Sequence, residues 1–311
     1  MASLHDVRPV LRSCGTWTFL KRLWHQIDED NLLVWASALA YSWLFAVFPF
    51  LILLLSLVPY LPQNTRNSAK DEITKSISTM LGKEAETINA NIGAVMNNPQ
   101  TGWLGIGLVV SLWVAAGGMT MTMSALDRCY EVKKPRPFYK QRAIALALTI
   151  AVILSVVVIM VLMPIGALVG NWAASQKVIS EPAKIAFDIA RYIVSFCFSM
   201  VVLSLIYYFG PNIKQKFHFI SPGALFSAVV WFVLDGVFRI YINRYAAYDK
   251  MYGTVGGAAI LLLFFYIDAL VLLIGAEINS EIDFERLGVP EGSTDFSKAV
   301  NPPLPTMAQE L

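Results

Sequence analysis

Charged residues are scarce in this chain. Asp, Glu, Lys and Arg make up only 15% of its 311 residues, whereas about 25% is usual for a soluble domain. A soluble protein of this length must cover one apolar core with a polar surface. The shortage of charge therefore excludes an ordinary water-soluble fold and indicates a chain surrounded by lipid.

Metal-binding, redox and phosphate-binding residues are equally sparse. The three histidines and three cysteines lie far apart and form no metal-binding or disulfide spacing: His5, His25, His218, Cys14, Cys129 and Cys197. No phosphate loop, dinucleotide fingerprint or nucleophile elbow occurs. The net charge of +2 gives no basic bias toward nucleic acid. We therefore expect no catalytic residue, no metal, no cofactor and no nucleic-acid partner, and hence no enzyme.

Long apolar runs are what the chain does contain. Hydrophobic residues make up 56% of it, and the mean hydropathy is +0.57. A helix needs about 20 apolar residues to cross the hydrocarbon of a bilayer. Six runs satisfy this length: residues 32–61, 102–126, 143–169, 183–209, 222–242 and 254–278. The sequence predicts an all-α, polytopic membrane bundle of about six transmembrane helices.

The first 31 residues form a cytoplasmic segment in this prediction, and they contain an amphipathic helix. Between residues 17 and 27 the apolar side chains share one face at helical spacing: Trp17, Phe19, Leu20, Leu23, Trp24 and Ile27. Lys21, Arg22, His25 and Gln26 take the other face. We expect this helix to lie on the inner leaflet, with membrane lipids as its partner.

Two further segments flank or interrupt the predicted transmembrane domain, residues 32–281. Residues 62–101 place apolar side chains at helical spacing and predict an outer amphipathic hairpin, which either caps a cavity or rests on lipid headgroups. Residues 282–311 are rich in Pro, Gly and Ser, a composition that predicts a disordered cytoplasmic tail.

Loop charge predicts the orientation. Basic residues gather before the first span, after the second and after the fourth, in segments that share one side of a six-span topology: Arg8, Arg12, Lys21, Arg22, Arg128, Lys133, Lys134, Arg136, Lys140, Arg142, Lys214 and Lys216. The loop at 62–101 is balanced between acids and bases. The positive-inside rule therefore predicts that both termini are cytoplasmic.

Five ionisable residues fall inside predicted spans, where charge is costly and often functional. Asp188, Arg191, Asp235 and Arg239 are predicted in the outer half of the bundle, either as a charged vestibule or as two local ion pairs. Asp268 has no basic residue one turn away in its own helix. It must face the interior, pair across helices or carry a proton, which makes it the best candidate for an ion-linked group.

A second polar group is predicted at the inner helix ends. It consists of Asp127, Arg128, Glu277 and Asn279. Side chains that reach the interface account for these residues without any function. An interhelical contact between Arg128 and Glu277 is the alternative.

Several short motifs occur in a recognisable order. They are ASALAYSWLF at 36–45 followed by Phe48-Pro49, ALDRCY at 125–130, PGA at 222–224 with Trp231, YGTVGG at 252–257, and GAEIN at 275–279. Over about residues 17–281, the chain resembles the BrkB/YihY family of bacterial membrane proteins. Two positions depart from the family pattern: Asp127 stands where Asn is more typical, and Gly257 where Ala is common. These departures weaken any transfer of site residues from the family.

The resemblance implies a six-helix protein of the bacterial inner membrane with cytoplasmic termini. It also implies transporter-like roles, and an old family label is ribonuclease BN. We expect a transporter or permease of a small solute, an ion or a lipid-derived molecule. The alternative is a non-transporting scaffold that binds an envelope protein or a lipid. We reject the ribonuclease function because the sequence has no cluster of His and Asp to hold a metal that activates water.

Overall fold

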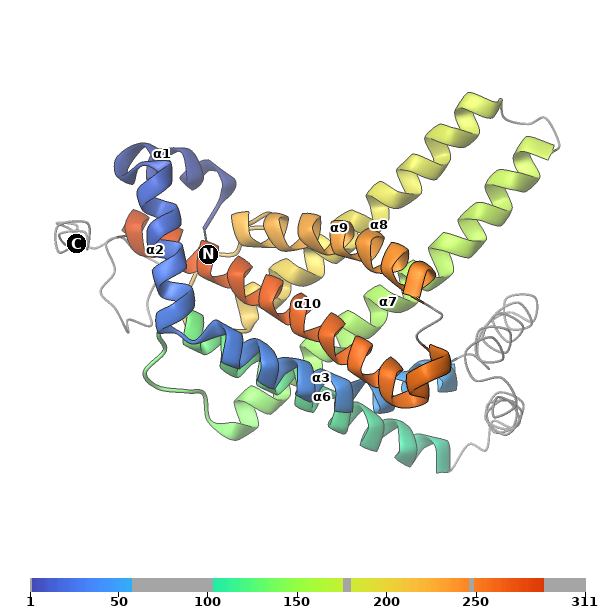
Figure 1. Cartoon of the computed structure of the whole chain (residues 1–311), viewed down its shortest axis with the longest axis horizontal. Helices are drawn as coiled ribbons and strands as arrows, with labels where there is room; N and C mark the ends of the chain where they lie inside the picture. Colours follow the sequence, from blue (N-terminus) through green and yellow to red (C-terminus); the bar gives the residue numbers. More distant parts are fainter. Residues whose placement is uncertain (1, 58–102, 176–179, 246–248, 288–311) are drawn as a thin grey trace. The chain divides into compact units, whose positions relative to one another are not determined.

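The computed structural model describes residues 2–57, 103–175, 180–245 and 249–287 (Figure 1). Within these ranges the regular structure is helical: α1 Leu4–Cys14, α2 Thr16–Glu29, α3 Leu32–Leu57, α6 Trp103–Cys129, α7 Phe138–Ser175, α8 Glu181–Phe209, α9 Pro222–Tyr245 and α10 Asp249–Leu287. The expected hairpin at 62–101 and most of the expected tail lie outside the described residues.

Five of these helices, α3, α6, α7, α8 and α10, are long and apolar enough to cross a membrane. In α9 the apolar stretch among the described side chains is shorter and covers Pro222–Phe238. The predicted all-α membrane bundle is confirmed. One boundary differs from the prediction, because α10 continues past residue 281 to Leu287 and buries Ile282 and Asp283.

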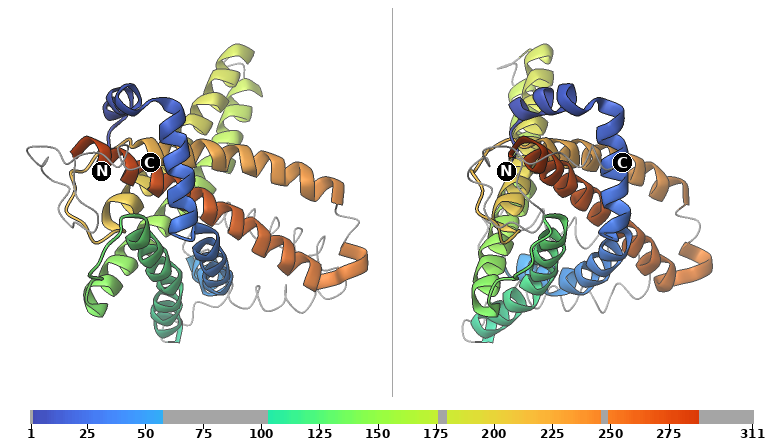
Figure 2. Two further views of the ribbon diagram at one scale, coloured as in Figure 1. Left: turned by 60° about the vertical axis from the view of Figure 1, so that its left-hand side comes forward. Right: turned by 90° about the vertical axis from the view of Figure 1, so that its left-hand side faces the viewer.

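The chain divides into two compact units. The larger unit comprises Met1–Leu44 and Gly118–Leu311, and the smaller unit comprises Phe45–Gly117. All contacts discussed below lie within the larger unit, where α9 packs on α10, α7 on α8, and α8 on α9. α1 and α2 pack on the C-terminal part of α10 (Figure 2).

The main core of the larger unit lies where α8, α9 and α10 meet the first turns of α3 and the last turns of α6. Its largest fully buried side chains are Leu32, Leu39, Leu126, Tyr130, Leu203, Tyr207, Leu272 and Leu273. Small residues such as Ala224, Ala228 and Ala276 fill the rest. Small side chains let helix backbones approach closely, which is a major source of helix association in membranes.

The closest approach joins α9 and α10 through two glycines. A Cβ atom on Gly223 would overlap the carbonyl oxygen of Gly275, and a Cβ on Gly275 would overlap the hydroxyl groups of Ser227 and Tyr207. The backbone N–H of Gly223 donates to the Asn279 Oδ1 atom at 2.9 Å. Glycine is therefore required at both positions by contact rather than by backbone dihedral angles.

Buried hydroxyl groups add hydrogen bonds beside this contact. Tyr207 Oη, from α8, donates to the Leu272 carbonyl of α10 at 2.8 Å and lies 2.8 Å from Ser227 Oγ of α9. Hydrogen bonds of this kind stabilise helix pairs in membranes by about 0.6 kcal/mol on average. Tyr207 thus links three helices at one level.

Arg136 closes the C-terminus of α8. Its guanidinium donates to the carbonyl groups of Phe209, Gly210 and Pro211 at 2.7, 2.8 and 2.7 Å. These carbonyls lack partners inside the helix, and a cation at this end also interacts favourably with the negative end of the helix dipole. Asp127 accepts the backbone N–H of Asn212 at 2.5 Å, so α6 and the loop after it hold the turn that follows α8.

The glycine contact predicts a marked asymmetry between two Gly→Ala variants. Gly275→Ala should destabilise the protein by about 1–3 kcal/mol or more, because the added methyl group forces α9 and α10 apart. Gly236→Ala, in α9, meets no atom within 4 Å and should stabilise the helix by up to about 1 kcal/mol. Thermal unfolding of both purified variants in detergent checks this. Equal unfolding temperatures would contradict the contact.

Candidate functional site

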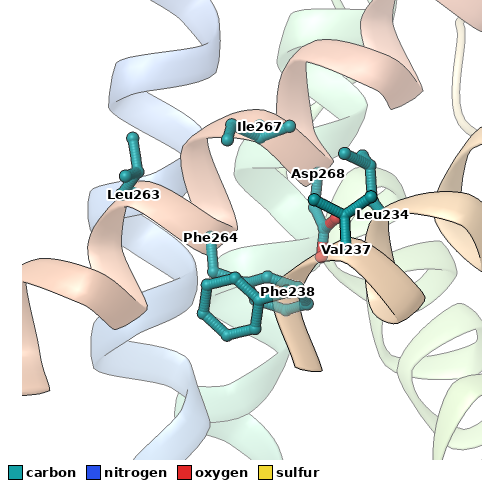
Figure 3. Close-up of a pocket in the computed structure, with 7 residues that line it drawn as sticks. All are labelled: Leu234, Val237, Phe238, Leu263, Phe264, Ile267 and Asp268. Atoms are coloured by element: carbon teal, nitrogen blue, oxygen red, sulfur yellow. The ribbon is translucent and has the colours of Figure 1, made fainter. Parts of the chain in front are cut away.

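A small cavity of about 150 Å³ lies between α9 and α10. Six of its seven lining residues are apolar and one is acidic: Leu234, Val237, Phe238, Leu263, Phe264, Ile267 and Asp268. Figure 3 shows the Asp268 carboxyl beside Leu234 and Val237. An apolar pocket with one converging polar group is the usual form of a small-molecule site.

Asp268 is held in this wall by its own backbone as well as by its position in α10. Its carbonyl oxygen accepts a hydrogen bond from Trp231 Nε1 of α9 at 3.2 Å. On one side of the cavity Phe238 and Phe264 pack with their ring centroids 4.4 Å apart. These contacts hold α10 against α9 at the level of Asp268.

A second carboxylate lies near Asp268. Asp235, on α9, acts electrostatically on Asp268. Two ionised carboxylates repel each other in an apolar surrounding, so a positive charge brought between them lowers their free energy. The structure thus brings together two of the five predicted intramembrane residues as a pair of acids.

The other predicted intramembrane charges have different surroundings. Arg191 Nη2 lies 3.0 Å from Asp188 Oδ1, one turn away on α8. The Arg191 side chain packs over Gly166 of α7, where a Cβ atom would leave it no room. This geometry is a local ion pair within α8 that packs against α7. The side chain of Arg239 lies outside the described residues, and its pairing with Asp235 stays a prediction.

The four residues predicted at the inner helix ends have separate partners. Asp127 holds the turn after α8, and Asn279 binds Gly223 in the α9–α10 contact. Arg128 pairs with Asp30, at 3.0 Å between Nη2 and Oδ1. Glu277 is buried and its Oε2 accepts a hydrogen bond from Ser280 at 3.1 Å.

Asp30 connects Arg128 and Glu277. Its carboxyl is buried and interacts with that of Glu277 as well as with the Arg128 guanidinium. Burial raises the pKa of Asp30, and the charge of Arg128 opposes that rise. The contact expected between Arg128 and Glu277 is thus replaced by one that runs through Asp30.

Sequence reasoning missed three residues of this framework. Asp30 precedes the first apolar run and belongs to no motif, and Arg136 is one of many loop cations. Tyr207 gave no signal inside its apolar run. Hydrogen-bond partners distant in sequence decide the roles of these residues, and a single sequence does not display such partners.

No metal centre emerges from the part of the chain that the structure describes, since no three His, Cys, Asp or Glu side chains there are placed to hold an ion. The acids of the larger unit are spread between the pocket and the inner helix ends. The chemistry open to the pocket is therefore binding or charge compensation by Asp268.

The similarity to known proteins extends over most of the chain and is not confined to the residues of this pocket. The family model described as "Virulence factor BrkB" matches residues 23–298. The chain is 30% identical over 264 residues to the "Putative ribonuclease-like protein YfkH" of Bacillus subtilis (strain 168), covering 85% of this chain and 94% of that protein. No solved structure matches the chain.

The chain is also similar to relatives named "UPF0761 membrane protein". The protein of Stenotrophomonas maltophilia (strain R551-3) is 26% identical over 286 residues, which cover 88% of this chain and 64% of that one. The protein of Psychromonas ingrahamii is 22% identical over 273 residues, covering 86% and 88%. The similarity therefore extends over most of this chain, although it spans less than two thirds of the Stenotrophomonas protein.

The Arg128–Asp30 pair predicts a pH-dependent loss of stability. The pKa of Asp30 is raised in the folded protein. Wild-type stability therefore falls as the pH rises from the pKa of an unfolded aspartate to the raised pKa of folded Asp30. Arg128→Gln removes the opposing cation and extends that fall to higher pH. Since Arg128 is 46% exposed, we expect a loss of only about 1 kcal/mol at alkaline pH, and a smaller loss at acid pH, where Asp30 binds a proton.

The measurement is thermal unfolding of both proteins across this pH range. Lys133→Gln removes an exposed cation from the loop after α6 and is the matched control, with no pH-dependent change expected. A loss for Arg128→Gln that grew toward acid pH would contradict the sign.

Proposed function

Because this chain belongs to the Virulence factor BrkB family and is a multi-pass membrane protein, we propose that it is a permease. Its cargo is a small solute, an ion or a lipid-derived molecule. The observation that carries the proposal is that Asp268 is the one acidic residue among those lining an apolar cavity between α9 and α10.

The energetic cost of this carboxylate supports a functional role. An acidic residue near the centre of a membrane helix costs about 2.5–3.5 kcal/mol. The Asp188–Arg191 pair offsets its own cost by a 3.0 Å ion pair. Asp268 instead has a second acid, Asp235, as its charged neighbour. A cationic cargo or a coupling cation would neutralise Asp268, which favours cation-linked transport.

Charge distribution supports an orientation with both termini in the cytoplasm of a bacterium, in its inner membrane. The basic residues of the loop after α6, including Lys133, Lys134 and Lys140, belong on the cytoplasmic side by the positive-inside rule. The same end of α10 carries the buried acids near α1 and α2.

Transport accounts for the cavity better than RNA cleavage does. The words "ribonuclease-like" belong to the name of the Bacillus protein. Hydrolysis of RNA needs groups that activate water and bind phosphate. Apart from Asp268, the residues that line the cavity are Leu, Val, Ile and Phe, which suit an apolar or amphipathic ligand rather than a phosphate chain.

The first test replaces the carboxylate. Asp268→Asn in proteoliposomes should reduce flux of protons, alkali cations or small organic cations at least tenfold, because the amide cannot compensate a positive charge. Asp28→Asn, which alters an exposed acid at the end of α2, should leave flux at the wild-type rate. Equal flux in wild type and Asp268→Asn would remove Asp268 from the mechanism.

The second test fills the cavity without touching the charge. Leu234→Trp adds bulk to the cavity wall and should lower flux severalfold while Asp268 is intact. Val229→Trp enlarges an exposed position of the same helix and serves as the matched control. If both tryptophan variants transport like wild type, the cavity is not part of the route.

A further inference from the structure

α2 has two apolar faces, and protein covers only one of them. Phe19 and Leu23 are buried with α1 and the end of α10. Trp17, Leu20 and Trp24 point elsewhere and are 80%, 55% and 74% exposed. Their spacing of three and four residues places them on one side of the helix. The sequence had assigned all five side chains to a single membrane-facing surface, and the structure divides them.

An ion-pair network fixes which face of α2 points outward. Arg22 was expected on the polar, solvated face, but it is buried against α10. Its Nη1 atom lies 2.9 Å from Glu285 Oε2 and 3.7 Å from Glu281 Oε1. Breaking a buried pair of this kind is strongly destabilising, because it leaves an uncompensated buried charge. α2 therefore cannot rotate to cover its tryptophans without losing this network.

The position of α2 along the chain sets its level relative to the membrane. α2 ends at Glu29, and the apolar span of α3 begins at Leu32. Asn31, with a φ of 54°, forms the sharp break between the two helices. Leu33, at the start of α3, is also exposed and apolar. The outward face of α2 thus lies next to the point where the chain enters hydrocarbon.

Tryptophan has the chemistry for that level. Its ring is largely apolar and its N–H group forms hydrogen bonds, and Trp is enriched where membrane hydrocarbon meets water. Lys21 lies one turn from Trp17 and is exposed, so its ammonium group can reach lipid phosphates while its stem lies along apolar surface. The face therefore matches a lipid interface in both its apolar and its charged groups.

We propose that Trp17, Leu20 and Trp24 insert into the lipid interface of the leaflet where α3 begins, while Arg22 holds the opposite face of α2 on α10. A second copy of the chain fits the face less well. An aromatic side chain buries about 150–250 Å², so two tryptophans and a leucine fall short of the roughly 800 Å² per partner of a stable dimer. The anchor couples the lipid surface to α10, the helix that carries Asp268.

Spin labels on two positions of α2 test the proposal in the full-length chain. Cys14, Cys129 and Cys197 are replaced by Ser, and a label is attached at Leu20→Cys or, as the matched control, at Glu29→Cys, an exposed position on another face. The protein is reconstituted in vesicles of phosphatidylethanolamine and phosphatidylglycerol. Collision with oxygen, which concentrates in lipid, is compared with collision with a water-soluble nickel complex.

We expect the label at 20 to favour oxygen severalfold over the nickel complex, and the label at 29 to show the reverse. Nickel preference at both positions would place the face in water and overturn the proposal. Oxygen preference at both would mean that α2 is wholly embedded, which also overturns it. Dipolar broadening between labels at 20 on two copies would assign the face to self-association instead.

A second measurement uses the native cysteines and avoids any loss of folding in the cysteine-free chain. Brominated acyl chains quench tryptophan emission in the interface. Brominated acyl chains should quench the tryptophan emission of the Trp17→Phe, Trp24→Phe double variant much less than that of wild type, because Trp17 and Trp24 supply a large part of the wild-type quenching. Unchanged quenching in the double variant would show that these two rings do not contact lipid.

Discussion

The contact between Gly223 and Gly275 is the constraint on which the rest of the larger unit depends. Lipid gives helices little hydrophobic reason to associate, so they must fit closely or form hydrogen bonds. Here the backbones of α9 and α10 touch because neither residue has a Cβ atom in the way. Asn279 and Tyr207 then use the short separation to bond with α9 and α10. A methyl group at either glycine would remove both the backbone contact and the hydrogen bonds that depend on it.

This constraint also sets the geometry of the candidate site. The contact between Gly223 and Gly275 holds α9 and α10 together. It brings the parts of the two helices near Trp231 and Asp268 opposite each other, and Trp231 donates a hydrogen bond to the Asp268 carbonyl. The cavity forms between these faces, with an acid on each helix. The C-terminal end of α10 is meanwhile held by two ion pairs, one between Glu285 and Arg22 of α2 and one between Arg286 and Asp6 of α1. α10 thus connects the peripheral helices to the cavity.

The sequence predicted the helices well because the bilayer imposes length and apolarity on every span. Residues 183–209 and 222–242 were expected as helices, and α8 and α9 coincide with them closely. It also singled out Asp268, because an isolated acid in an apolar run is visible without a structure. It did not predict that Asp235 lies near Asp268, or that Arg22 is buried, because both depend on how helices rotate about their axes. Periodicity specifies a face, and only packing specifies the neighbour.

A density map of the wild-type protein in a lipid bilayer tests the central claim most directly, because it shows the rotation of α10 against α9. The account predicts the Gly275 carbonyl against the Cα atom of Gly223, and the Asp268 carboxyl facing Leu234 and Val237 of α9. An α10 rotated so that Asp268 turned away from α9, with side-chain density separating the two glycines, would contradict it.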